Sequence, residues 1–227
     1  MCAQLDFIIL HIFITFANSI RKPKRYMAKI KFIFDLDGTI TSEETLPLMA
    51  KHFNVQEEIE QLTRETIQGD IPFVESFIRR VFILGKLPVD EVASLLENVK
   101  LYPDLADFIR AHKEQCVVAT GNLLCWSEKL LARLGCEAYC SDAIVENNKV
   151  VKLTKILRKE VVVEKYQEEG YKVVYVGDGN NDMEAMRVAD IAIAVGMTHS
   201  PSKSILPITN YLIFNEKALC RQLNQLL

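Results

Sequence analysis

The sequence predicts an α/β fold, a doubly wound parallel (Rossmann-like) sheet with a small inserted helical cap. Three observations lead to this prediction. Short apolar and β-branched runs are apolar on both faces, as in buried parallel strands. These runs alternate with apolar residues at helical spacing. One long stretch after the first run shows helical spacing only, which indicates a helical insertion.

Four runs are expected to form strands, and each ends in a polar loop: residues 29–35, 116–122, 172–179 and 191–195. Residues 211–214 are a candidate for a fifth strand. Between them, residues 103–112 form an expected helix opened by Pro103, and an apolar spacing from Leu123 to Leu134 is closed by Gly135.

The helical spacing from residue 43 to residue 99 predicts a cap, and residues 27–42 with 100–227 then form the catalytic core. The cap leaves the core just after the first strand and returns near residue 102. Both hinges therefore lie over the carboxyl ends of the strands, where α/β folds bind ligands.

Residues 1–26 form an apolar N-terminal extension whose place in the native fold stays open. Its apolar part, residues 5–20, contains Asp6 and is shorter than the roughly 20 residues of a membrane span. The basic residues 21–25 follow this part, whereas a secretory signal carries its positive charges first. We expect no membrane association. The alternative is that Met27 is the true start of the chain.

Composition narrows the function classes. A net charge of −3 over 227 residues offers no basic face for nucleic acid. The six cysteines include no CxxC pair, which favours a reducing compartment, and we expect a cytoplasmic protein. The four histidines show no metal-ligand spacing, and neither they nor Trp126 is assigned a role. The oligomeric state is not predicted.

Polar residues follow three of the expected strands. Asp35 and Asp37 follow the first, residues 120–122 end the second, and Asp178 with Asp182 follows the third. The carboxyl ends of parallel strands meet at one edge, so these groups should converge there. Several carboxylates at one edge would destabilise the fold unless a hard cation neutralised them. Oxygen ligands of this kind indicate Mg²⁺.

These residues resemble the haloacid dehalogenase superfamily of phosphotransferases. DLDGT matches the family's first motif, Thr120 the second, a downstream lysine the third and GDGNND the fourth. The resemblance implies that Asp35 attacks phosphorus to form an aspartyl phosphate, and that Asp37 protonates the leaving group and then activates water. It also implies a Mg²⁺ cofactor held by Asp35, Asp178 and the backbone carbonyl of Asp37.

The resemblance assigns further roles. The Thr120 hydroxyl and the Gly121 backbone would bind phosphate oxygens, Asn181 would contact the substrate, and Asp182 would support the site behind the metal. The motif lysine stays open because several lysines lie in the right interval: Lys149, Lys152, Lys155 and Lys159. We choose Lys159 because it opens an expected helix ended by Gly170, as in the family.

Residues 43–81 resemble the phosphoserine phosphatase-like subfamily without a gap. This resemblance implies that Glu44 faces a substrate ammonium, Arg80 a substrate carboxylate, and that Phe73 forms an apolar wall. The sequence departs from the subfamily at Ile67, at Asn122 and in the shorter segment before Lys159. The second of these places a side chain in the substrate pocket where relatives have glycine.

The leading functional hypothesis is a Mg²⁺-dependent hydrolase of phosphomonoesters, phosphoserine phosphatase-like, whose partner is a small phosphorylated metabolite. One alternative is a phosphatase for another such metabolite. A second is a phosphotransferase that passes the phosphoryl group to a hydroxyl acceptor. A non-catalytic phosphate-binding regulator is a third, which the Asp35 and Asp37 pair disfavours because binding alone does not require it.

Overall fold

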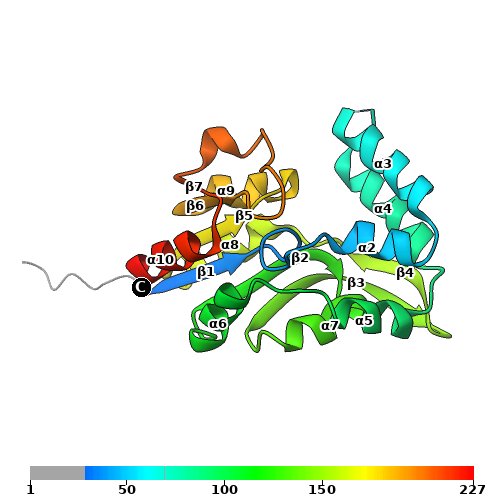
Figure 1. The fold of residues 1–227 in the computed structure, drawn as a ribbon, viewed down its shortest axis with the longest axis horizontal. Coiled ribbons are helices and arrows are strands. Elements are labelled where there is room, and N and C mark those ends of the chain that lie inside the picture. Colours follow the sequence, from blue (N-terminus) through cyan, green and yellow to red (C-terminus); the bar gives the residue numbers. More distant parts are fainter. Residues whose placement is uncertain (1–28, 69) are drawn as a thin grey trace, which may run out of the picture.

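The computed structural model describes residues 29–68 and 70–227 (Figure 1). The N-terminal extension, residues 1–26, lies outside the described residues. Among the helices of the described part, none is long and apolar enough to cross a membrane.

The described residues build a seven-stranded sheet in the order β4-β3-β2-β1-β5-β6-β7. Its strands are β1 (Ile30–Phe34), β2 (Cys116–Leu123), β3 (Glu137–Glu146), β4 (Lys149–Lys155), β5 (Lys172–Gly177), β6 (Ile191–Val195) and β7 (Tyr211–Ile213). All neighbouring strands are parallel except β3 and β4, which pair antiparallel. The predicted α/β fold class and the five predicted strands are confirmed.

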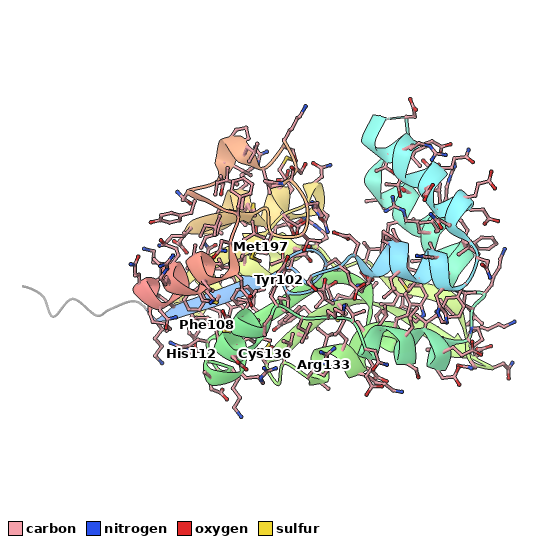
Figure 2. The ribbon with its side chains drawn as sticks, viewed as in Figure 1. Tyr102, Phe108, His112, Arg133, Cys136 and Met197 are labelled. Atoms are coloured by element: carbon pink, nitrogen blue, oxygen red, sulfur yellow. The ribbon has the colours of Figure 1, made fainter. Side chains whose placement is uncertain are left out.

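Helices cover both faces of the sheet because successive residues of its buried strands point in opposite directions. Phe32 and Phe34 of β1 face the cluster that packs on α6 (Pro103–Ala111), α7 (Leu124–Ala132) and α10 (Glu216–Leu226). Ile33 faces the cluster of α8 (Lys159–Glu168) and α9 (Met183–Val188). Phe108 of α6, labelled in Figure 2, packs edge-on against Phe32 with ring centroids 5.6 Å apart.

Four helices lie between β1 and α6: α2 (Thr45–His52), α3 (Gln56–Gln68), α4 (Phe73–Leu84) and α5 (Val89–Glu97). Figure 1 shows α3 and α4 projecting from the sheet as a pair, while α5 lies beside α7. An isolated bridge between Thr41 and Leu101 joins the chain where it leaves the core and where it returns. The boundaries of the cap at residues 43 and 99 stay a prediction.

The β3–β4 hairpin was not predicted from the sequence. Most of its residues are exposed, so it lacks the apolar runs by which the other strands were identified. Its turn is formed by Asn147 and Asn148, whose φ angles of 48° and 62° suit a tight hairpin turn. The hairpin is bonded to the helical segment, since Val150 N donates to Gly85 O at 3.0 Å and Val89 N donates to Asn148 O at 2.9 Å.

Candidate active site

Three acidic side chains meet at the carboxyl edge of the sheet, as the sequence predicts. Asp35 follows β1, Asp178 follows β5, and Asp182 lies in the short 3₁₀ helix η1 (Asn180–Asp182). One carboxylate oxygen from each lies within 4.8 Å of the others. All three side chains are buried, at 4%, 4% and 0% exposed. Like charges that lie this close together and are excluded from water require compensation by positive charge.

Lys159 supplies part of that compensation. It is the first residue of α8 and is 4% exposed. Its Nζ lies 2.6 Å from Asp35 Oδ1 and 2.7 Å from Asp182 Oδ1. Burial alone would lower the pKa of Lys159, but the Asp182 and Asp35 carboxylates raise it above its ordinary value, so the ammonium stays charged.

The other candidate lysines, Lys149, Lys152 and Lys155, lie exposed on β4. Of the four lysines considered from the sequence, Lys159 is therefore the one that the structure brings to the carboxylates.

Asp182 has both oxygens occupied by protein donors. Oδ1 accepts from Lys159 and from the Tyr175 hydroxyl at 2.7 Å. Oδ2 accepts from the backbone N–H groups of Asp178 at 3.1 Å and Gly179 at 2.9 Å. This carboxylate thus fixes the loop that carries Asp178 and holds Lys159 in place.

One oxygen of Asp35 leaves a position for a hard divalent cation. Asp35 Oδ1 accepts from Lys159 and from Leu36 N at 2.8 Å, whereas its Oδ2 takes no hydrogen bond within the described residues. Burial, with Asp182 next in importance, raises the pKa of Asp35 well above its usual range. A cation beside Asp35 and Asp178 would offset that cost, and oxygen ligands of this type suit Mg²⁺.

Asp37 is held in place from two sides. Its Oδ1 accepts from Thr45 N at 3.1 Å, at the start of α2. Its Oδ2 accepts from Asn122 Nδ2 at 2.8 Å, and the same amide group donates to Thr45 Oγ1 at 3.1 Å. Burial raises the pKa of Asp37. Asn122, expected from the sequence to contact substrate, lines the cavity and also orients Asp37 through its amide.

The end of β2 offers space for an anion. Gly121 lines the cavity described below, and a Cβ atom built on it would meet nothing within 4 Å. Thr120 is fully buried, and its hydroxyl accepts from the Asn122 backbone N–H at 3.1 Å. An oxyanion can therefore approach the backbone closely at Gly121.

A cavity of about 290 Å³ connects the carboxylates with the helical segment. Asp35, Asp37 and Asp178 line its polar part, together with Glu44 and the exposed Asn181. The remaining lining is mostly apolar and includes Met49, Phe77, Val81, Leu84 and Trp126.

Among the described residues, Arg80 of α4 is the one arginine that lines this cavity. Its Nη2 donates to Thr63 Oγ1 at 3.2 Å, and its buried Nε has no partner within the described residues. The side chain of Phe73, the predicted apolar wall, lies outside what the structure describes. The cavity therefore combines an acidic end, an apolar wall and one guanidinium group with an unpaired Nε–H donor.

His199 is the site residue that the sequence analysis missed. It lies on the loop after β6, with Nε2 2.7 Å from Glu44 Oε1 and 3.0 Å from Asp178 Oδ2. The hydrogen bond to Asp178 is the main cause that raises the pKa of His199 to about 10, and burial raises the pKa of Glu44 to about 7. A single histidine forms no metal-ligand or catalytic spacing in the sequence. The one feature that could have indicated its role is its place after a parallel strand, because the loops after such strands lie at the carboxyl edge of the sheet.

Comparisons with known proteins agree with this geometry. The sequence matches the family described as haloacid dehalogenase-like hydrolase over residues 32–190. It is 30% identical to phosphoserine phosphatase of Saccharomyces cerevisiae over 185 residues, which cover 74% of this chain and 59% of that protein. It is 27% identical to phosphoserine phosphatase of Methanocaldococcus jannaschii over 175 residues, which cover 71% of this chain and 83% of that protein.

The chain thus spans well under two thirds of the length of some of these relatives, with 51% for phosphoserine phosphatase of Archaeoglobus fulgidus. Among solved structures, a phospho-aspartyl intermediate analogue of phosphoserine phosphatase superimposes with a TM-score of 0.73 at 24% identity, over 87% of this chain and 98% of that chain. A substrate-bound phosphoserine phosphatase complex gives 0.72 at 23% identity, over 87% and 97%. These structural likenesses show the fold.

Gly38 is expected to be irreplaceable because its missing side chain makes room for the acidic cluster. Its φ is +70°, and a Cβ atom would lie 2.7 Å from Glu44 Oε1, 3.0 Å from Asp178 Oδ2 and 3.0 Å from His199 Nε2. Gly135 is a matched control, with φ of +69° and nothing within 4 Å. Both alanine variants should lose about 1–2 kcal/mol of unfolding free energy to backbone strain.

Gly38→Ala should lose more than Gly135→Ala, because only the first variant adds close contacts to the backbone strain. Urea unfolding followed by circular dichroism measures both losses. Equal losses of stability in the two variants would show that the cluster over Gly38 adjusts freely.

Proposed function

The chain belongs to the haloacid dehalogenase-like hydrolase family, and from this premise we propose that it is a Mg²⁺-dependent phosphomonoester hydrolase that works through an aspartyl phosphate. The observation that carries the proposal is that two carboxyl groups in different environments line the same cavity. Asp35 is fixed by Lys159 and keeps one oxygen free, while the half-buried Asp37 lies two residues away with a raised pKa.

In the first step, a carboxylate oxygen of Asp35 attacks phosphorus and the ester P–O bond breaks. The leaving alkoxide takes a proton from the Asp37 carboxyl group, which holds a proton more readily because burial raises its pKa. Lys159, charged and within 2.6 Å of Asp35, offsets negative charge on the transferring group. The open backbone at Gly121 receives phosphoryl oxygens.

In the second step, Asp37 takes a proton from water, and this water attacks the aspartyl phosphate. The acyl phosphate P–O bond breaks, inorganic phosphate leaves, and Asp35 is regenerated as a carboxylate. Thr45 and Asn122 keep Asp37 aimed into the cavity through both steps. Asp35 and Asp178, with the carbonyl of Asp37 as a further proposed ligand, would hold Mg²⁺, which would offset charge on the phosphoryl group.

The proposed substrate is a small phosphomonoester with an anionic group at its far end. The cavity of about 290 Å³ limits its size, and the unpartnered Nε of Arg80 supports an anion there. Phosphoserine is the first substrate to test, since relatives bear its name. A phosphatase for a related metabolite is the alternative, and we propose the cytoplasm as the compartment because the sequence has no CxxC pair.

Phosphate release is expected to depend on Mg²⁺. A panel of phosphomonoesters, including phosphoserine and phosphoethanolamine, is assayed with MgCl₂, after chelation by EDTA, and after Mg²⁺ is restored. Activity should vanish on chelation and return with Mg²⁺, because Asp35 and Asp178 then regain their counter-charge. Turnover that survives EDTA would contradict the metal assignment. No release from any ester would contradict the proposed function.

Asp35→Asn is expected to abolish turnover while the protein stays folded. An amide is a poor nucleophile and a weak Mg²⁺ ligand, and it can still accept hydrogen bonds from Leu36 and Lys159. Steady-state phosphate release and circular dichroism measure the two effects. Asp107→Asn, on the exposed face of α6, is the control and should behave like the parent. Retained turnover in Asp35→Asn would remove this residue as the nucleophile.

Asp37→Asn is expected to slow turnover by roughly 10²–10⁴-fold, the usual contribution of general acid–base catalysis. The loss should be smaller for p-nitrophenyl phosphate, whose leaving group needs no proton. Comparison of kcat for this ester and for phosphoserine measures the difference. Equal losses for the two esters would show that Asp37 does not protonate the leaving group.

A further inference from the structure

Tyr175 of β5 lies beside the carboxylate cluster but does not line the cavity, so it does not touch a substrate there. Its side chain is fully buried in the apolar cluster that α8 and α9 cover. A phenylalanine ring would fill this place as well as a tyrosine ring does. The hydroxyl group is therefore the part of the residue that needs an explanation, because a buried polar group costs free energy unless it is hydrogen-bonded.

Within the described residues, this hydroxyl makes one hydrogen bond, which it donates to Asp182 Oδ1 at 2.7 Å. The same oxygen accepts from Lys159 Nζ, also at 2.7 Å. Lys159 Nζ in turn lies 2.6 Å from Asp35 Oδ1. A continuous chain of short contacts thus runs from Tyr175 through Asp182 and Lys159 to Asp35.

We propose that Tyr175 is a positioning residue whose hydroxyl keeps the Lys159 ammonium on Asp35. It acts through Asp182 and makes no contact with the reacting groups. This inference rests on the proposed function, since Asp35 and Lys159 act in the reaction proposed above.

The physical reason is competition between two carboxylates for one ammonium. Lys159 Nζ lies at nearly the same distance from Asp35 and from Asp182, at 2.6 and 2.7 Å. The Tyr175 hydroxyl offsets part of the negative charge on the Asp182 oxygen that Lys159 contacts, which weakens the attraction of that oxygen for the ammonium. Without the hydroxyl, Lys159 is the only donor to this oxygen among the described residues, and it should move toward Asp182 and away from Asp35.

A displaced Lys159 would weaken the chemical step more than it weakens substrate binding. The ammonium would offset less negative charge where Asp35 meets the phosphoryl group, and a charge held at that point acts most strongly in the transition state. Arg80 and the apolar wall of the cavity lie outside this chain of contacts. The loss should therefore appear in kcat and leave KM nearly unchanged.

Tyr166→Phe is a matched control for Tyr175→Phe. Tyr166 of α8 is also buried in the same apolar cluster, and its hydroxyl also donates to a carboxylate, Glu137 Oε2, at 2.6 Å. Glu137 is the first residue of β3 and does not line the cavity. Both variants thus lose a buried hydroxyl that is bonded to a carboxylate, but only Tyr175→Phe alters the contacts of Lys159.

Tyr175→Phe should lower kcat for phosphate release by roughly 10-fold, the order that one hydrogen bond to a charged group contributes. Tyr166→Phe should match the parent in kcat and KM. Both constants are measured with MgCl₂ on the ester that the parent hydrolyses fastest, and circular dichroism follows the fold. An unchanged kcat in Tyr175→Phe, or equal falls in the two variants, would overturn the inference.

Inhibition by orthovanadate gives a readout that does not depend on the amount of folded enzyme. Vanadate adopts the five-coordinate geometry of phosphoryl transfer, so its inhibition constant reports how well the site stabilises that arrangement. This constant should rise in Tyr175→Phe by about the factor by which kcat falls, and it should stay unchanged in Tyr166→Phe.

Two results would assign the Tyr175 hydroxyl to the stability of the core and overturn the inference. One is an unchanged inhibition constant in Tyr175→Phe, and the other is a Tyr175→Phe variant that no longer folds. The proposed function fails on a different result, the absence of phosphate release from every ester by the parent enzyme, so the two failures are distinguishable.

Discussion

The crowding of buried carboxylates at one edge of a parallel sheet is the constraint on which the rest of the structure depends. Asp35, Asp178 and Asp182 lie close together with almost no contact with water. Lys159 is the side chain that makes this arrangement tolerable, although it sits at the first residue of α8, where a helix dipole disfavours a cation. Its contacts at 2.6 and 2.7 Å outweigh that disadvantage.

The backbone contributes as much as the charges do. Asp182 can turn back onto its own loop because Gly177 has no side chain, since a Cβ atom there would lie 2.5 Å from Asp182 Oδ2. Gly38 plays the same part over Glu44 and His199. Gly38 of the DLDGT motif and Gly177 of the GDGNND motif thus leave the space that the carboxylates occupy, and Gly38 in addition adopts a φ of +70° that favours glycine.

The parts of this fold that bury apolar runs could be predicted from the sequence. The central strands follow from their apolar runs, and the approach of Asp35, Asp178 and Asp182 follows from their positions after those strands. The β3–β4 hairpin escaped prediction because its exposed residues bear no such pattern.

The cavity was harder to predict from the sequence than the strands. Asn122 lines the cavity, but the sequence did not predict the bond from its amide to Asp37, a contact between segments 85 residues apart. His199 and Glu44 meet across 155 residues, and neither position carries a local signal of the other. Contacts of this kind depend on how loops cross the edge of the sheet, which periodicity does not encode.

The distribution of charge around the cavity bears on the kind of substrate that it can hold. Among the described residues, four side chains with carboxyl groups line it, Asp35, Asp37, Glu44 and Asp178. Lys159 lies buried beside Asp35 and Asp182 and compensates part of their charge. A divalent cation at Asp35 and Asp178 would add positive charge where the phosphoryl group binds, and Arg80 adds it where α4 borders the cavity. Because both of these positions attract anions, this distribution supports the proposed substrate, a small phosphomonoester with a second anionic group.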